Sequence, residues 1–293
     1  MTMREVGSMS IRSMRLGRKA SARLGRLVVF IVLSLGAFAF VAPFVWVLST
    51  SLKSTDQLYD LSVGWLPKPP IWSNYREALT FLPFATYFKN TMFVCALAVI
   101  GSLLSCSMVA YAFARLRFPG RNVLFVLVIS TTMMPWAVRI IPTYLIFKYI
   151  GWVGTLTPLW FPAFLGTATY IFLLRQFFMG IPYDLTDAAR IDGCGEVGIY
   201  WRVMLPLSGP ALTVIAIFAF LNQWNDFIRP LIYLSDQSQY TMALGLQLFI
   251  GLDTTHWNLL MAAAVAMTVP VLFIFAFFQR YMIQGVTLTG IKG

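Results

Sequence analysis

Residues 27–50 read LVVFIVLSLGAFAFVAPFVWVLST and contain no charged side chain. As an α-helix this stretch would be about 36 Å long, enough to cross the roughly 30 Å hydrocarbon core of a bilayer. A secretory signal has a shorter apolar region of about 7–15 residues, followed by a cleavage site of small residues. The stretch therefore predicts an uncleaved membrane span.

Five further apolar runs follow along the chain, at 91–114, 122–137, 157–178, 212–234 and 259–282. Pro135, Arg139 and Pro142 interrupt the third, so we expect that span to be kinked or to continue outside the membrane over residues 140–150. The pattern predicts an all-α integral membrane protein with six transmembrane helices. A short interfacial helix is expected near residues 75–80, after a Pro/aromatic loop at 65–70.

The composition of the whole chain agrees with a membrane protein. Of 293 residues, 59% are hydrophobic and 11% are charged, and the mean hydropathy is +0.75. Soluble domains carry about 25% charged residues, so a soluble enzyme is excluded.

Cys95 and Cys106 fall on one predicted helix, about 16 Å apart, too far for a disulfide.

The charges predict the orientation. The formal net charge is +11, and 15 of the 22 Lys and Arg residues lie in segments 1–26, 115–121, 175–208 and the C-terminal end from Arg280 on. Because cytoplasmic loops carry the excess of positive charge, we expect both termini in the cytoplasm. The predicted organisation is a basic tail at 1–26, a six-helix domain at 27–283 and a C-terminal tail at 284–293. We expect contact with membrane lipid and none with nucleic acid.

Catalytic and metal-binding motifs are absent from the sequence. There is no G-x-x-x-x-G-K-[ST] phosphate loop, no HExxH and no EF-hand loop. The single histidine, His256, is a poor metal ligand without neighbouring Cys or Glu. As the base for a nucleophilic Ser208 it is also a weak candidate, because the two are expected on opposite faces. We predict that the chain is not an enzyme and holds no cofactor.

The segment 180–208 differs from the other loops on its side because its carboxylates outnumber its basic residues. Asp184 could cap the start of a helix, with Asp187 as its partner three residues on, and Gly193 suits the left-handed residue that ends one. A second helix would place Val197, Tyr200, Trp201 and Met204 on one face, until Pro206 breaks it. Two interpretations remain open: an amphipathic loop lying on lipid headgroups, or a docking site for a protein. Helices on headgroups usually present Lys and Arg, which favours a protein partner.

This segment resembles the cytoplasmic loop signature of importer permeases of the ATP-binding cassette class. The signature reads Glu-Ala-Ala, three residues, Gly, nine residues, then Ile-x-Leu-Pro. The sequence has Asp187-Ala188-Ala189, then Gly193, then Val203-Met204-Leu205-Pro206, with the same spacing throughout. Asp187 replaces Glu and Val203 replaces Ile, so charge and shape are kept.

Other stretches resemble the maltose-type carbohydrate importers, and among them the smaller maltose permease. The matching stretches are Pro43-x-x-Trp46 with 49–53, Asn74-Tyr75, Tyr87-Phe88-x-Asn90-Thr91, 224–227 and the ending 279–293. The resemblance covers the chain from about residue 30 and implies a type I-like importer fold with a helix–turn–helix coupling loop at 180–208.

The resemblance implies a multi-subunit machine in a prokaryotic cytoplasmic membrane. Its partners would be a second permease in a heterodimer, a dimer of ATPase subunits that binds ATP and Mg, and an extracytoplasmic sugar-binding protein. Asp187 would pair with a basic residue of the ATPase, Ala188 and Ala189 would permit close contact, and Gly193 would allow the turn. Leu205 and Pro206 would fix the link to the fifth span. Gly290, Lys292 and Gly293 would extend along the ATPase, unless the C-terminus is simply frayed.

A polar–aromatic cluster in the fifth span is a candidate for the substrate path. Asn222, Trp224, Asn225 and Asp226 combine amide and carboxylate groups with an aromatic ring, which sugar recognition needs, and polar groups in spans usually face the bundle. A structural role is equally consistent with the pattern, because Asp226 and Arg229 could pair on one helix face.

We therefore predict a permease subunit of a binding-protein-dependent importer that moves a sugar, as a di- or oligosaccharide, with ATP hydrolysis in a separate chain. One alternative keeps the machinery and changes the cargo to glycerol-phosphate or a polyol. Another, an autonomous secondary transporter, predicts an inverted repeat and unpaired ionisable residues at mid-membrane, neither of which the sequence presents.

Overall fold

The computed structural model describes residues 3–60, 63–251 and 255–290, with side chains described between 25 and 279 outside the same gaps. Its described part is helical, without a named strand. The main helices are α1 (Met3–Ser51), α2 (Thr55–Tyr59), α3 (Ser73–Phe81), α4 (Phe84–Arg115), α5 (Arg121–Ser130), α6 (Trp136–Tyr149), α7 (Thr157–Trp160), α8 (Ala168–Gly180), α9 (Tyr183–Ile191), α10 (Glu196–Ile199), α11 (Leu205–Leu207), α12 (Gly209–Trp224), α13 (Ile228–Tyr233), α14 (Met242–Leu246) and α15 (Trp257–Gly290).

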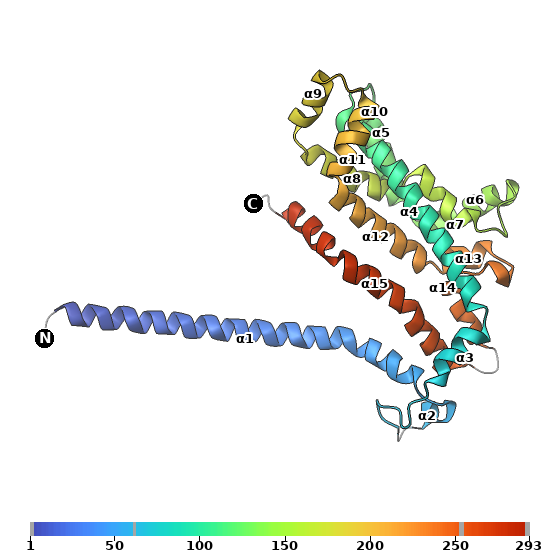
Figure 1. Cartoon of the computed structure of the whole chain (residues 1–293), viewed down its shortest axis with the longest axis horizontal. Helices are drawn as coiled ribbons and strands as arrows, with labels where there is room; N and C mark the ends of the chain where they lie inside the picture. Colours follow the sequence, from blue (N-terminus) through green and yellow to red (C-terminus); the bar gives the residue numbers. More distant parts are fainter. Residues whose placement is uncertain (1–2, 61–62, 252–254, 291–293) are drawn as a thin grey trace.

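The number of membrane spans agrees with the prediction. Four stretches are long and apolar enough to cross a bilayer, namely 25–51, 84–115, 157–180 and 257–279. Two bent helix pairs bring the number to six among the described residues if each pair counts as one span. Figure 1 shows α9 and α10 at one end of the bundle and α2 and α3 at the other.

The bent pairs refine the predicted span limits. The third span turns by 101° at Pro135, between the stretch 121–133 and α6, which confirms the expected kink. Pro142 lies inside α6 and does not end it. The fourth span is not one regular helix, because a 3₁₀ turn (Phe161–Leu165) and Gly166, with a φ of +89°, separate α7 from α8.

The fifth span was wrongly predicted as one stretch at 212–234. Its helix α12 ends at Trp224, and α13 starts only at Ile228. At its other end α12 meets the helical stretch 196–207 at an angle of 79°. Hydropathy alone could not locate these breaks, because apolar residues continue on both sides of them.

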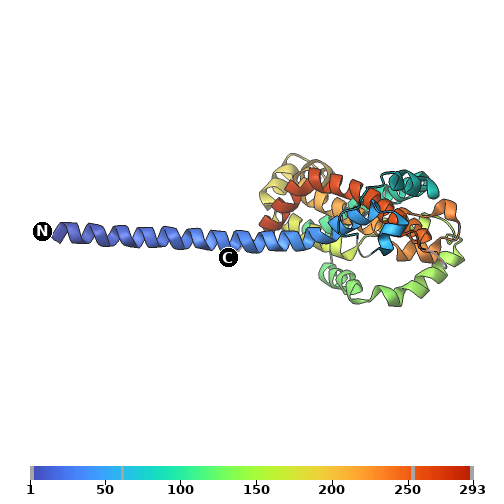
Figure 2. The same cartoon turned by 90° about the horizontal axis from the view of Figure 1, so that it is seen from below.

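Helix α1 extends the first predicted span toward the N-terminus, so residues 3–26 continue the same helix. Figures 1 and 2 show α1 projecting away from the other helices over most of its length. The apolar window of its span is 0% buried. Near its C-terminal end α1 packs against α15. The span thus presents apolar surface that other helices of this chain leave uncovered.

Helix α4 is the central element of the bundle and packs against α8, α12 and the 3₁₀ turn 161–165. Gly101 permits the last of these contacts, because the ring of Phe164 lies against its Cα and would overlap a Cβ. A buried cluster joins α4 to the 180–208 segment through Tyr111, Tyr200 and Met204.

Two asparagine side chains hold neighbouring segments together through hydrogen bonds to backbone carbonyls. The Asn74 amide donates to the carbonyls of Ser51 and Lys53 at 2.9 and 2.8 Å, and the hydroxyls of Ser51 and Tyr75 are 2.8 Å apart. The predicted interfacial helix is therefore present as α3, and it fixes the end of α1. Asn90 similarly donates to the carbonyls of Ser238 and Tyr240 at 2.9 and 3.0 Å.

We predict that Gly101→Ala lowers the stability of the bundle by about 1–3 kcal/mol, the cost of overpacking a tight contact. The added methyl group would displace the Phe164 ring from α4. The measurement is the thermal unfolding midpoint of the purified protein. Gly36→Ala is the matched control, since no atom lies within 4 Å of the added Cβ on α1. An equal midpoint for the two variants would contradict the assigned contact.

Candidate functional site

The segment 180–208 begins with a short helix whose C-terminal turn is well defined. Helix α9 ends at Ile191, and Gly193 has a φ of +82°, in the left-handed region that favours glycine. The amide of Gly193 donates to the carbonyl of Arg190 at 3.0 Å, and that of Cys194 to the carbonyl of Ala189 at 2.9 Å. This pair of bonds is the Schellman motif. The predicted turn at Gly193 is confirmed.

The predicted cap at the start of the helix is wrong. Pro182 is the N-cap residue and Asp184 already lies in the first turn, with no side-chain cap bond. The proline ring holds φ at −56°, a value that suits entry into a helix, so the helix starts before Asp184. Asp184 still places a negative charge at the positive end of the helix dipole.

Asp187 pairs within its own segment. Its carboxylate lies 2.8 Å from one terminal nitrogen of Arg190, and the other nitrogen lies 3.0 Å from the Glu196 carboxylate. Arg190 thereby bridges α9 and α10 across the Gly193 turn. Hydrogen bonds to Glu196 raise the pKa of the Arg190 guanidinium, despite some desolvation. These groups are substantially exposed, so each pair contributes at most about 1 kcal/mol.

Glu196 also connects the segment to the central helix. The Tyr111 hydroxyl on α4 donates to the second oxygen of the Glu196 carboxylate at 2.7 Å. One turn earlier on α4, the Ser107 hydroxyl lies 2.7 Å from that of Tyr200. A continuous polar chain thus runs from exposed Asp187 through Arg190 and Glu196 to α4.

Arg115 fixes the other end of the segment at the C-terminal end of α4. Its guanidinium donates to the carbonyl of Phe178 at 2.6 Å and to that of Ile181. It also lies 4.2 Å from the centre of the Tyr183 ring. The cation therefore binds the carbonyl end of α8, where the helix dipole is negative, and packs under the start of α9.

The exposed face of the segment differs from the predicted one. Tyr200 and Met204 are buried as expected, but Val197 is 72% and Trp201 49% exposed. A π-helical turn over Tyr200–Met204 changes the angular spacing, so the four residues do not share one face. The residues buried together with Tyr200 are Ile199 and Ala189, in place of Val197 and Trp201.

The other signature residues lie at both the surface and the base of the segment. Ala188 is exposed, and so are Gly193 and Pro206, whereas Leu205 is half-buried. Pro206 was expected to break the helix, but it lies within α11, and the bend comes at Ser208. Ser208 is buried and donates to the carbonyl of Met204 at 2.6 Å.

The predicted polar–aromatic cluster lies at the opposite end of α12. Arg229 Nε lies 2.6 Å from the Asp226 carboxylate, and its terminal nitrogen donates to the Gln223 side chain at 2.7 Å. Asn222 and Asn225 are exposed beside them. The Asp226–Arg229 pair is therefore present, although Asp226 belongs to the break before α13 and not to the helix face predicted for it.

Trp224 cannot act as an exposed platform for a sugar in this structure, contrary to the expectation. It is 1% exposed, with its ring 5.2 Å from that of Phe220 and 6.2 Å from that of Phe88. It is part of the core between α4, α12 and α15. Apart from Phe220 on the same helix, the apolar residues that bury it come from α4 and α15, which the local sequence could not indicate.

The C-terminal contact predicted from the sequence is only partly described. Gly290 is the last residue of α15, while Lys292 and Gly293 lie outside the described residues.

Cys95, Cys106 and Cys194 are free thiols. Within the described ranges, no group of three His, Cys, Asp or Glu residues could hold a metal ion.

Sequence reasoning missed the residues that connect the segment to the bundle. The sequence identifies Arg190 and Glu196 only as charges of the segment and Arg115 only as a positive residue next to a span, and it indicates no role for Tyr111. A basic or hydroxyl residue near the end of a long apolar helix was the available signal. Their partners became visible only once α4, α8 and α10 were placed together.

We predict that Tyr111→Phe and Glu196→Gln are energetically coupled by about 1 kcal/mol, the usual contribution of one hydrogen bond. The measurement is a double-mutant cycle on the free energy of unfolding of the purified protein. Asp236→Asn, at an exposed site far from this chain of contacts, is the control that should add independently to Tyr111→Phe. Full additivity of the first pair would contradict the assigned bond.

The comparisons with known proteins agree with one another. The family described as "Binding-protein-dependent transport system inner membrane component" matches residues 101–288. The arabinooligosaccharides transport system permease protein AraQ of Bacillus subtilis is 32% identical, over 92% of this chain and 96% of its own. The sn-glycerol-3-phosphate transport system permease protein UgpE of Yersinia enterocolitica is 32% identical, over 87% of this chain and 93% of its own.

A solved structure supports the fold. A chain of a bacterial ABC transporter involved in the import of the acidic polysaccharide alginate aligns with a TM-score of 0.80 and 24% sequence identity. The alignment covers 89% of this chain and 97% of the other.

Proposed function

This chain belongs to the family of binding-protein-dependent transport system inner membrane components, and from that premise we propose that it moves a carbohydrate across the cytoplasmic membrane. It is a permease of the ATP-binding cassette importer class. Membership of this family rules out the alternative of an autonomous secondary transporter. We propose that a separate subunit binds ATP and Mg and hydrolyses the nucleotide.

The exposed, acidic apex of the 180–208 segment is the observation that supports our proposal of a contact with the ATPase. Asp187 and Ala188 are exposed on α9, and Ile191 is 87% exposed beside the Gly193 turn. Exposed apolar residues next to carboxylates suit a protein cleft with basic residues better than anionic headgroups. The contacts that lead from Arg190 to Tyr111 would transmit a displacement of this apex to helix α4.

We propose a second permease and membrane lipid as the occupants of the uncovered surface of α1. None of the apolar window of α1 is buried in this chain, although α4 has 39% of its own buried. An extracytoplasmic binding protein follows from the class of importer. The excess of basic residues at 1–26 and 115–121 supports cytoplasmic termini, with α2 and α3 on the outer side.

The cargo we propose is a di- or oligosaccharide. AraQ is named for arabinooligosaccharides, and the related alginate importer is named for a polysaccharide. Asn222 and Asn225 expose amide groups at the break after α12, where they could bind hydroxyl groups. The name of UgpE supports glycerol-phosphate as the alternative cargo.

We predict that Ala188→Arg abolishes transport while leaving the permease folded. Ala188 is exposed, so the longer side chain is tolerated in the isolated chain but blocks close contact with the ATPase. Cargo-stimulated ATP hydrolysis and uptake by cells should both fall to background. Gly193→Pro should give the same loss, because it removes the amide that bonds to Arg190.

Two variants control this experiment. Ala188→Ser keeps the residue small and should retain activity. Thr80→Arg places the same new charge on an exposed position of α3, at the other end of the bundle, and should also retain activity. Normal uptake by Ala188→Arg would refute the ATPase contact.

We predict that Asn225→Ala raises the Km for transport by up to about tenfold, the effect expected from losing one hydrogen bond to the cargo. The variant should unfold at the same temperature as the wild type, because Asn225 is exposed and its amide bonds only within its helix turn, to Leu221. Asn122→Ala, exposed at the opposite end of the bundle, is the control. Unchanged Km and maximal rate would assign Asn225 a structural role.

A further inference from the structure

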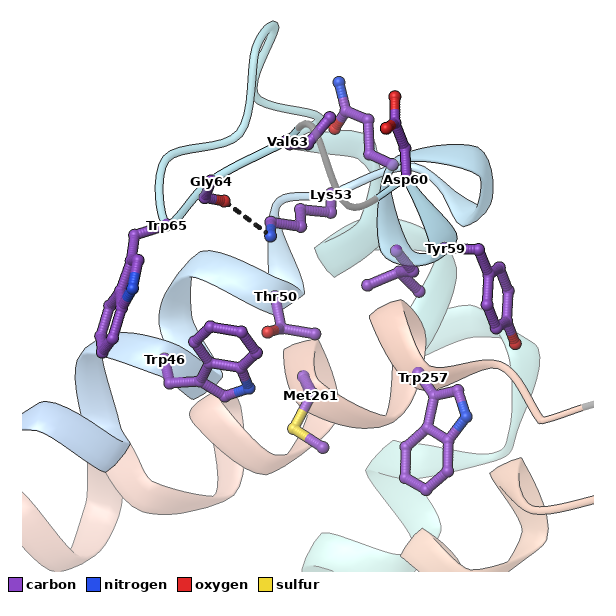
Figure 3. Close-up of a pocket in the computed structure, with 12 residues that line it drawn as sticks. Trp46, Thr50, Lys53, Tyr59, Asp60, Val63, Gly64, Trp65, Trp257 and Met261 are labelled. Carbon is purple, nitrogen blue, oxygen red and sulfur yellow. Dashed lines mark hydrogen bonds between the residues drawn. The ribbon is translucent and has the colours of Figure 1, made fainter.

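A cavity of about 620 Å³ lies between the end of α1, the loop after α2 and the start of α15. Figure 3 shows Trp46 and Trp257 on either side of Met261, with Thr50 and Lys53 above them. Two bonds hold described residues of the loop in place: Gln57 donates to the Lys68 carbonyl at 2.6 Å, and the amide of Ile71 donates to the Leu52 carbonyl at 2.8 Å. The cavity therefore has an ordered wall and a volume suited to a small group.

Lys53 brings a buried positive charge to this cavity. The residue is 5% exposed, and its ammonium donates to the Gly64 carbonyl at 3.0 Å. Among the described residues, no carboxylate lies within 4.0 Å of it. In Figure 3 the carboxylate of Asp60 is on the far side of the lysine chain from the ammonium.

The contacts present compensate this charge only in part. The centre of the Trp46 ring lies 5.5 Å from the ammonium, within the range of a cation–π interaction. An ammonium has three N–H donors, and Gly64 accepts one. A buried charge is costly without a counter-charge and acceptors for its remaining donors. An anion with two oxygen acceptors would supply both.

The position of the cavity indicates which anion can reach it. Trp46 and Thr50 are in the last turns of the apolar stretch 25–51, and Trp257 starts the stretch 257–279. The cavity is thus at the boundary of the membrane, on the side away from the 180–208 segment. Trp46, Trp65 and Trp257 are each 42–54% exposed, as expected for indole rings at the level of lipid headgroups.

We propose that this cavity binds the phosphate diester of an anionic phospholipid headgroup from the adjacent leaflet. The free N–H donors of Lys53 bind two phosphate oxygens, and the Thr50 hydroxyl is placed to donate a further bond. The indoles of Trp46 and Trp257 pack against the glycerol backbone. A neutral sugar could stack on the same rings, but it would add no counter-charge for Lys53.

The test uses the full-length permease, purified with the subunits that accompany it, stripped of lipid and then titrated with phosphatidylglycerol in mixed micelles. Native mass spectrometry measures the bound lipid. Lys53→Gln should bind one phosphatidylglycerol about tenfold more weakly, the effect expected from losing a charge-assisted bond. Lys89→Gln, an exposed lysine at the same end of the bundle, should bind like the wild type. Equal binding by all three proteins would overturn the proposal.

A second measurement does not depend on the folding of a variant. Wild-type protein is irradiated with a phosphatidylglycerol that carries a photoreactive headgroup, and the labelled peptides are identified. Labelling within 46–65 and 257–261, reduced by excess phosphatidylglycerol, supports the proposal. Labelling elsewhere overturns it, and so does protection by maltose alone, which would assign the cavity to a sugar. Protection by free glycerol phosphate as effective as that by the lipid would overturn the lipid as the source of the phosphate.

Discussion

The carbonyl groups that become free wherever a helix breaks inside the bundle need a donor, because a bilayer offers no water to replace it. Several breaks in the described part of this chain have such a donor. Ser105 donates to the Ala163 carbonyl at 2.9 Å beside the fourth span, and Gln223 to the Leu159 carbonyl at 3.1 Å. Arg115 binds the carbonyl end of α8. The few polar side chains of this apolar chain therefore make its irregular helices possible.

Two donors on α4 give the 180–208 segment its position. Arg115 fixes the entry to α9, and Tyr111 fixes Glu196 at the start of α10. Both residues are on α4, so the segment is bound to the most central helix of the bundle and not to a peripheral one. The proposed ATPase contact depends on this attachment, because a loop lying loosely on headgroups would yield without moving the spans.

Much of this architecture could be predicted from residue patterns. Hydropathy located the spans, Pro135 the sharp bend and Gly193 the turn, because each depends on a property of the residues at that place. The burial of Trp224 could not be predicted, since it depends on Phe88 of α4 and on the packing of α15 against α12. The exposure of Val197 and Trp201 could not be predicted either. A π-helical turn, which is a local change in backbone hydrogen bonding, alters the direction in which side chains leave the helix. For the candidate site, the sequence predicted the signature positions but not the contacts that attach them to α4.

The sequence by itself determined that the chain lies in a membrane, how many times it crosses, and which loop differs from its neighbours. These follow from transfer free energies and backbone preferences, which act residue by residue. Only the tertiary structure decided that Glu196 meets Tyr111, that Arg115 meets the carbonyl of Phe178, and that Lys53 meets a carbonyl but no carboxylate among the described residues. Electrostatic partners depend on distances between segments far apart in the chain, and those distances exist only after the helices have packed.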